Sequence, residues 1–335
     1  MVNKNNIFLN PKSNFQFSKL RGLDLQELLV QIDNLYLTYR DTLNLPTSLT
    51  FGVEIEYEKC DRHDTTLFVD SNLPKWISKD DGSLSSGGEI ASPILNDQEK
   101  TWKELKTICE FLKQKQADTL HRAGGHIHIG ISILGSKYEN WRRFLKIYAV
   151  YESIIYRFVY GDKISARRGM LEYARPTADL LINKIDVIDR LEKVRELEEL
   201  FNTCPRRQAL NFKNADFYRP DAIELGNTLE FRSPNGTCEE VIWQNNINAL
   251  TKTVFSATLA KIDEDFLNYK LKNNPILYKQ TPYMYNEVCL KNALEFVDIV
   301  FDNNLDKVYF LKQYLKGFED NYGLKYAVMA KKMVK

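Results

Sequence analysis

Residues 49–58 alternate between apolar and polar side chains, and this pattern is the strongest constraint that the sequence places on the fold. Because successive side chains of a β-strand point to opposite faces, Glu54, Glu56 and Glu58 share one face and the apolar residues pack behind it. Glu54 and Glu56 then lie about 6–7 Å apart along the strand. Taken alone, the pattern is more typical of an edge strand whose polar face is solvated.

Residues 124–134 show the same alternation, with isoleucines on one parity and His126 and His128 on the other. The chain contains 4 histidines, so these two neighbours are half of them. Two imidazoles on one strand face, about 6–7 Å apart, can reach a common metal ion or phosphate. Glycines on either side permit close approach of a ligand, so we favour a functional pair over two surface histidines.

Three shorter segments, residues 89–92, 208–213 and 228–233, place polar residues opposite apolar ones in the same way. Their polar members include Glu89, Asn211, Glu230 and Arg232. An exposed ion pair across strands would explain Glu230 and Arg232 when these two are considered alone. Several strands with such a face predict a sheet that packs one face on helices and lines a pocket with the other.

The rest of the chain is predicted to be mainly helical. Apolar residues at helical spacing mark residues 19–43, 98–117, 137–160 and 185–203, a helix of about 28 residues after Asn235-Gly236, and a helical end from about residue 270. A loop is expected between the first strand and residue 88. Strands mixed with helices without regular alternation predict an α+β fold with an antiparallel sheet. We divide the chain into a tail and helix over 1–45, a central domain over 46–270 and a helical extension over 271–335.

Composition and charge exclude several classes of protein. Lys and Arg total 46 against 45 for Asp and Glu, giving a net charge of +1, which argues against binding of nucleic acid or anionic membranes through net charge. Neither an apolar run of about 18 residues nor a start typical of signal peptides is present. The 5 cysteines are scattered without a C-x-x-C motif, so we expect a reducing cytoplasm and no disulfide framework.

Carboxylates gathered on one sheet face would repel one another unless cations lie among them. Oxygen ligands with a single imidazole suit Mg²⁺ or Mn²⁺ better than Zn²⁺. Arg232, together with Arg206 or Arg207, suits the outer oxygens of a phosphate. The sequence contains no G-x-x-x-x-G-K-[ST] and no G-x-G-x-x-G motif. These residues therefore predict a metal-assisted phosphoryl-transfer site that is built from carboxylates on an antiparallel sheet.

The ordered motifs FGVEIE, DGS…GGEIASP, GGHIHIG and ALNF…LEFR…NGT resemble the amidoligase family over roughly residues 50–240. This family is grouped with the carboxylate–amine ligases related to glutamine synthetase and glutamate–cysteine ligase. The segment ISARRGMLEYARPTAD adds Arg167 or Arg168 and Tyr173 at matching places. The resemblance implies a glutamine-synthetase-like catalytic sheet over the central domain, with ATP and Mg²⁺ or Mn²⁺ as cofactors.

Transferred residue by residue, the resemblance implies that Glu54 and Glu56 bind different metal ions. Glu89 would join Glu56, whereas His126 and Glu230 would complete the site of Glu54. His128 would lie near the nucleotide phosphates, and the arginines would contact the transferred phosphoryl group. The further candidates for nucleotide binding are Asn211, Arg167, Arg168 and Tyr173. A second acidic ligand beside Glu89 has Asp80 and Asp81 as candidates, which we interpret as turn residues.

The implied activity is ATP-dependent amide formation through an acyl phosphate. Small-molecule or peptide carboxylates and amines would be the substrates, and no nucleic-acid or membrane partner is expected. Two alternatives stay open. The first is a non-catalytic binding or assembly protein that retains the ligase fold. The second is a metal-dependent hydrolase that uses His126 and His128, although the other two histidines, His63 and His121, lie in segments unlike strands.

Overall fold

The computed structural model describes residues 7–9, 35–119, 122–161, 167, 169–259, 262–273 and 287–315. Its main strands are β3 (Phe51–Glu58), β4 (Ile77–Lys79), β5 (Gly87–Ala91), β6 (Gly125–Gly130), β7 (Leu210–Asn211) and β8 (Thr228–Phe231). They form one sheet in the order β4-β5-β3-β6-β8-β7, and every neighbouring pair is antiparallel. Together with the helices, this sheet confirms the predicted α+β class with an antiparallel sheet.

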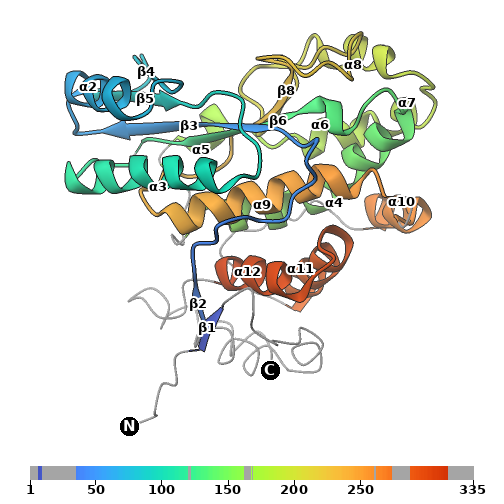
Figure 1. Cartoon of the computed structure of the whole chain (residues 1–335). Helices are drawn as coiled ribbons and strands as arrows, with labels where there is room; N and C mark the ends of the chain where they lie inside the picture. The colour runs from blue at the N-terminus through green and yellow to red at the C-terminus, as the bar shows by residue number, and fades with distance from the viewer. Residues whose placement is uncertain are drawn as a thin grey trace.

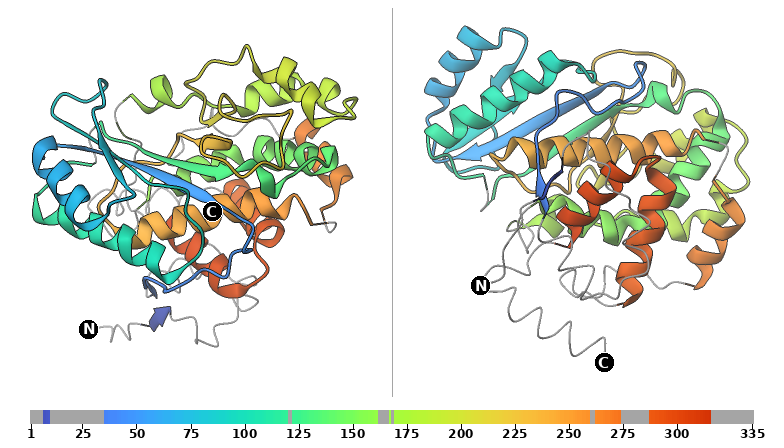
Figure 2. Two further views of the ribbon diagram at one scale, coloured as in Figure 1. Left: turned by 45° about the horizontal axis from the view of Figure 1, so that its top comes forward. Right: turned by 60° about the horizontal axis from the view of Figure 1, so that its bottom comes forward.

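The rest of the described structure consists mainly of helices. They are α2 (Arg62–Asn72), α3 (Glu99–Gln114), α4 (Tyr138–Val159), α5 (Met170–Tyr173), α6 (Ala178–Asn183), α7 (Ile185–Ile188), α8 (Leu197–Phe201), α9 (Glu240–Ser256), α10 (Glu264–Asn273), α11 (Glu287–Val300) and α12 (Asn304–Tyr314). Figure 1 shows α3, α4 and α9 directly below the sheet and α11 and α12 below α9. In the right-hand view of Figure 2, α9 again lies between the sheet and these last two helices. None of the described helices is both long and apolar enough to span a bilayer.

The apolar parity of β3 faces these helices, as the alternation predicts. Phe51 is 2% exposed and stacks on Trp102 of α3, with the ring centroids 5.5 Å apart. Tyr148 of α4 meets Phe231 of β8 at 5.9 Å between centroids. Because α4 is buried along most of its length, its aromatic side chains belong to the hydrophobic core. The opposite parity of the sheet is thereby left for polar side chains.

The prediction of a loop between the first strand and residue 88 is wrong in part, because this segment contains α2 and β4. Asp61 begins α2 by accepting a hydrogen bond from the backbone N–H of His63 at 2.8 Å. Thr65 and Val69 are the buried residues of this helix. The apolar residues of α2 cluster at 67–69 and form no stripe at helical spacing, which is why periodicity does not predict it.

The helix predicted over residues 185–203 is also wrong as a single element. It is split into α7, a 3-10 turn η3 (Val194–Glu196) and α8. The Glu196 carboxylate accepts hydrogen bonds from the backbone N–H groups of Glu192 at 2.9 Å and Lys193 at 2.8 Å. This capping arrangement starts a new helix in the middle of the predicted one.

Two further elements are shorter than predicted. The helix after Asn235-Gly236 ends as α9 at Ser256, and α10 follows as a separate helix. The strand over 124–134 ends as β6 at Gly130, where a 3-10 turn η2 (Ile131–Ile133) begins. Apolar side chains continue through both junctions, so the pattern alone does not mark these ends.

The helix predicted over residues 19–43 is wrong where the structure describes it. Residues Leu35–Leu37 form strand β2, which pairs in parallel with β1 (Ile7–Leu9). Residues 19–34 lie outside the described part of the chain. A short run such as Leu-Tyr-Leu fits a helix or a strand, and its pairing with β1 decides between them.

The described part of the C-terminal extension is mainly helical, as predicted, whereas residues 274–286 and 316–335 lie outside the described residues. One hydrophobic cluster includes Leu43, the central sheet and Phe310. The three-part division of the chain stays a prediction.

A buried group of charges attaches α12 to α9. The Asp306 carboxylate accepts hydrogen bonds from Arg40 Nη1 at 2.7 Å and from Asn248 Nδ2 at 2.8 Å, and it also contacts Lys252 Nζ. Burial raises the pKa of Asp306, but the charges of Lys252 and Arg40 outweigh this effect and hold the pKa below its ordinary value. An ionised carboxylate therefore joins α12, α9 and the segment before β3.

A methyl group added at Gly125 would lie 2.4 Å from the Cη2 atom of Trp243. Since both residues are buried, Gly125→Ala should lower the free energy of unfolding by about 1–3 kcal/mol. Gly82→Ala, where nothing lies within 4 Å of the added methyl, should change it by less than about 0.5 kcal/mol. Urea unfolding measures both values. Equal stability of the two variants would contradict this close packing of β6 on α9.

Asp306→Asn removes the carboxylate between Arg40 and Lys252, and we expect the free energy of unfolding to fall by about 3–5 kcal/mol at neutral pH. Because the folded pKa lies below the unfolded value of about 3.9, the stabilisation is present above that value and is lost as the pH falls through the lower folded pKa. The deficit should be equal at about pH 7 and pH 5 and shrink only below about pH 4.

Denaturant unfolding of wild type and variant at each pH measures this deficit. Asp41→Asn, at an exposed position next to Arg40, is the control and should have little effect. A deficit that already shrinks between the two higher pH values would contradict a lowered folded pKa.

Candidate active site

The strand register brings the predicted polar side chains together on the sheet face opposite to the helices. The directly opposed pairs are Glu56 with Glu89, Glu54 with His126, and His128 with Glu230. Opposed side chains of neighbouring antiparallel strands have their Cβ atoms about 5 Å apart. Residues far apart in sequence, on β5, β3, β6 and β8, therefore form one cluster.

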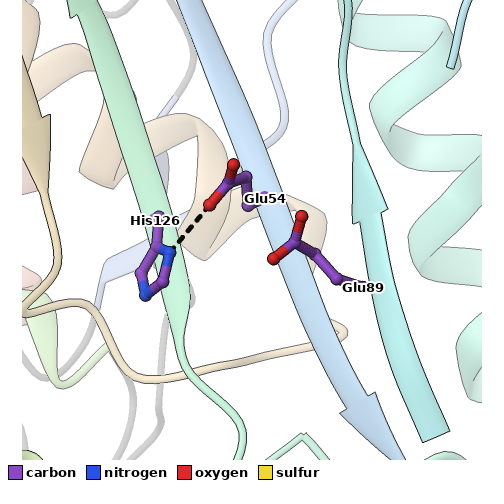
Figure 3. A group of neighbouring side chains, drawn as sticks. All are labelled: Glu54, Glu89 and His126. Carbon is purple, nitrogen blue, oxygen red and sulfur yellow. Dashed lines mark hydrogen bonds and ion pairs between the residues drawn. The ribbon is translucent and has the colours of Figure 1, made fainter. Parts of the chain in front are cut away.

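His126 lies at the centre of this cluster and is 5% exposed. Its Nδ1 atom is 2.8 Å from Glu54 Oε2 and 3.5 Å from Glu230 Oε1, and its Nε2 atom is 3.3 Å from Glu56 Oε1. Figure 3 shows His126, Glu54 and Glu89 side by side on three adjacent strands. Burial lowers the pKa of His126, but the hydrogen bond with Glu54 and the charge of Glu56 outweigh it, so the pKa is raised.

Two neighbouring carboxyl groups have pKa values shifted in opposite directions. Burial raises the pKa of Glu54, but the hydrogen bond with His126 and the nearby imidazole of His128 outweigh it and hold this pKa well below its ordinary value. Burial and the negative charge of Glu54 raise the pKa of Glu89. A cation between the two carboxylates would favour the ionised form of both.

Three groups of side chains offer one ligand atom per residue, with all atoms of a group within 4.8 Å of one another. The groups are Glu54, Glu89 and His126; Glu54, His128 and Glu230; and Glu56, Asp81 and Glu89. Each contains at most one imidazole, a donor set that suits Mg²⁺ or Mn²⁺ better than Zn²⁺.

The buried Nε2 atom of His128 supports this fit. It has no hydrogen-bond partner among the described residues and lies 3.5 Å from Glu54 Oε1. Buried polar atoms normally have a partner, and a bound ligand would supply one. The residues present therefore fit the divalent ions that the resemblance implies.

Asp81 is both a turn residue, as predicted, and a member of one of the three donor groups. Its Oδ1 atom accepts a hydrogen bond from the backbone N–H of Ser83 at 2.8 Å, as a turn residue does. The same side chain is within reach of Glu56 and Glu89. The turn before β5 thus brings in one of the two carboxylates that the sequence offers as a second acidic ligand beside Glu89, although the sequence by itself favours the turn role alone for it.

Asn211 and Arg232 hold Glu230 from two sides. Asn211 Nδ2 donates to Glu230 Oε2 at 2.6 Å, and Arg232 Nη1 contacts Glu230 Oε1. The Arg232 Nε atom also donates to the carbonyl oxygen of Tyr173 at 3.2 Å. In this arrangement Asn211 fixes a carboxylate of the cluster, and its contact with a nucleotide stays a prediction.

A cavity of about 480 Å³ adjoins the carboxylates and is also lined by arginines. These are Arg122, Arg167, Arg207 and Arg232. Arg167 is buried and donates to the carbonyl oxygens of Arg232, at 2.9 Å, and Pro234. The Arg207 guanidinium lies 4.8 Å from the ring centroid of Tyr173.

Of the two arginines left open by the sequence, Arg207 lines this cavity and Arg206 does not. Arg206 is exposed. Arg168 and His121 lie outside the described residues, and His63 is exposed in the first turn of α2.

A second cavity, of about 250 Å³, adjoins the first at Glu54 and Lys79. Its lining includes Gly52, Ile94, His128 and the loop at residues 222–228. Lys79 lines both cavities, yet the sequence analysis did not select it. Its strand of three residues lies within a segment that was predicted to be a loop.

A family model described as "Putative amidoligase enzyme" matches residues 66–254, more than half of the 335-residue chain. The chain belongs to this amidoligase family. This match confirms the resemblance inferred from the ordered motifs. Membership of the family indicates a ligase-type function at the level of the family. The matched range contains β5, β6, β7 and β8, whereas β3 with Glu54 and Glu56 precedes it. No curated protein matches the chain.

Mn²⁺ or Mg²⁺ should raise the melting temperature of the protein, because an ion that binds the folded state alone stabilises it by about 2.7 kcal/mol at 100 times its Kd. Glu54→Gln should reduce this rise, since Glu54 belongs to two of the three donor groups. Thermal unfolding followed by circular dichroism, with and without the ion, measures the rise.

Glu58→Gln is the matched control on the same strand face. Glu58 Oε1 is engaged by Ser85, whose backbone N–H donates to it at 2.9 Å, and Glu58 belongs to none of the donor groups in the described chain. An equal rise in both variants would contradict the assignment of Glu54.

Proposed function

We propose that this member of the amidoligase family is an ATP-dependent carboxylate–amine ligase with a glutamine-synthetase-like catalytic sheet. The observation that carries the proposal is the cluster of Glu54, Glu56, Glu89 and Glu230 around His126, which borders a cavity that arginines also line. Active sites for phosphoryl transfer commonly combine carboxylates that hold divalent ions with arginines that contact phosphate oxygens. Family membership directs this chemistry toward formation of an amide.

The carboxylates would hold Mg²⁺ or Mn²⁺ through the donor groups already described. When bound, such ions neutralise phosphate charge and polarise the phosphoryl group that is transferred. Arg232 and Arg207 line the same cavity and supply guanidinium groups for the outer phosphate oxygens. Arg167 adds a buried positive charge whose donors are engaged by backbone carbonyl oxygens, so we assign it to shaping this wall.

The nucleotide has room in the second cavity, beside His128. This cavity is lined by apolar side chains such as Ile94 and Ile223 and by the small residues Gly52 and Gly130. An apolar slot beside a polar, ion-binding cavity matches a nucleotide, whose base is flat and largely apolar and whose phosphates are charged. The phosphates would then extend past Glu54 and Lys79 into the larger cavity.

In the proposed reaction, an oxygen of the substrate carboxylate attacks the γ-phosphorus of ATP. A carbon–oxygen–phosphorus linkage forms, the bond from the γ-phosphorus to the bridging oxygen breaks, and ADP leaves. The amine nitrogen then attacks the acyl carbon, loses a proton, and releases inorganic phosphate. The chain's residues bind and orient the reactants and balance charge, and no side chain forms a covalent intermediate.

The two other functions considered from the sequence have weaker support. A zinc-type hydrolase normally needs more imidazole ligands, and each donor group in the described chain contains at most one. A non-catalytic scaffold offers no reason for gathering four carboxylates on one sheet face at a cost in repulsion. The five cysteines are free thiols, which supports the proposed cytoplasmic location.

Isotope transfer tests the mechanism. With a panel of carboxylates labelled with ¹⁸O, amines, ATP and Mg²⁺, we expect phosphate release that requires both substrates. One ¹⁸O atom should move from the carboxylate to the released phosphate, because the acyl phosphate breaks at its carbon–oxygen bond. Mass spectrometry of the phosphate measures this transfer.

Glu230→Gln should lower turnover by at least about 100-fold, because the Glu230 carboxylate belongs to the charged groups that orient the reactants. Glu110→Gln, at an exposed position on α3, should leave turnover unchanged. Label in AMP would indicate an acyl adenylate in place of an acyl phosphate. Turnover without ATP would indicate a hydrolase. Either result would contradict the proposed reaction.

A further inference from the structure

Lys79 reaches into the carboxylate cluster from the edge of the sheet. It ends β4 directly opposite Glu89 in the strand register. Its Nζ atom lies 3.3 Å from Glu89 Oε1 and 4.0 Å from Glu54 Oε1. Among the described residues, Lys79 is the only cation within 4.0 Å of Glu89.

The position of this ammonium coincides with a candidate ion site. Glu54 and Glu89, with His126, form one of the three donor groups. An ion bound to both carboxylates would lie about 2.0–2.6 Å from their oxygens, and therefore only a few ångströms from Nζ. Like charges at such a separation repel strongly, so the ammonium and the ion would not occupy this place together.

The side chain of Lys79 has room to leave. It is 46% exposed, and its four-carbon stem is flexible. Lys79 lines both cavities, so a displaced ammonium remains at their junction. In the proposed function, this junction is where the phosphates pass from one cavity to the other.

We propose that the Lys79 ammonium is the counter-ion of Glu54 and Glu89 as long as no divalent ion is bound. A divalent ion displaces this ammonium, and the Lys79 side chain then binds a phosphate oxygen of the nucleotide. The exchange couples occupancy of the ion site to binding of the phosphate. The first half of this inference rests on the ion site and the second half on the nucleotide of the proposed function.

Lys79→Met tests the exchange by calorimetric titration with Mn²⁺ in the absence of nucleotide. Removal of the competing cation should tighten Mn²⁺ binding about three- to tenfold, as expected for a partly exposed ion pair. The variant should also melt at a lower temperature than wild type without Mn²⁺, and Mn²⁺ should raise its melting temperature more. Lys79→Arg, which keeps the charge, should bind Mn²⁺ much as the wild type does.

The second half is tested at saturating Mn²⁺ with a non-hydrolysable ATP analogue. Lys79→Met should bind the analogue about three- to tenfold more weakly, because one charge contact with phosphate is lost. Lys75→Met, the same change at an exposed lysine four residues earlier, is the control and should alter neither affinity.

Unchanged or weaker Mn²⁺ binding by Lys79→Met would overturn the displacement. Tighter Mn²⁺ binding with unchanged affinity for the analogue would overturn the transfer of Lys79 to phosphate. Failure of the wild type to bind Mn²⁺ would instead overturn the ion site of the proposed function. This outcome is measured on the wild type, so it is distinguished from a failure of the Lys79 exchange, which is measured by comparing Lys79→Met with the wild type.

Discussion

The pairing of β3 with β5 on one side and β6 on the other is the constraint on which the rest of the structure depends. It places Glu56 opposite Glu89 and Glu54 opposite His126 on one face, while Val53, Ile55 and Tyr57 on the other parity of β3 face the helices. A slip of one residue would send the carboxylates into the apolar layer, where an unpaired charge is very costly. The cost of burying a carboxylate therefore fixes the register, and the register builds the site.

Charge balance is the second organising principle of the cluster. The carboxylates are compensated by His126 in the centre, Arg232 at Glu230 and Lys79 at Glu89. Such compensation is incomplete, since Glu89 keeps a raised pKa and the Nε2 atom of His128 has no hydrogen-bond partner in the part of the chain that the structure describes. Divalent ions would meet both deficiencies, which is the physical reason for connecting this sheet with metal-assisted phosphoryl transfer.

The helix α9 links the site to the C-terminal helices. Trp243 of α9 packs against Gly125 of β6, one residue before His126. At its other contacts, α9 supplies Asn248 and Lys252 to the buried carboxylate of Asp306 on α12. Packing on one side and ionic contacts on the other thus hold the strand that carries His126 against a rigid support.

The sequence by itself determined the two faces of the strands, since side-chain alternation is local and needs only the period of two. It therefore selected Glu54, Glu56, Glu89, His126 and Glu230, which the structure brings together. Only the tertiary structure decided that Leu35–Leu37 is a strand, that Arg207 rather than Arg206 lines the cavity, and that Lys79 and Asp81 reach the cluster. These features depend on which strand pairs with which and on where turns place a side chain, and no local pattern encodes such long-range contacts.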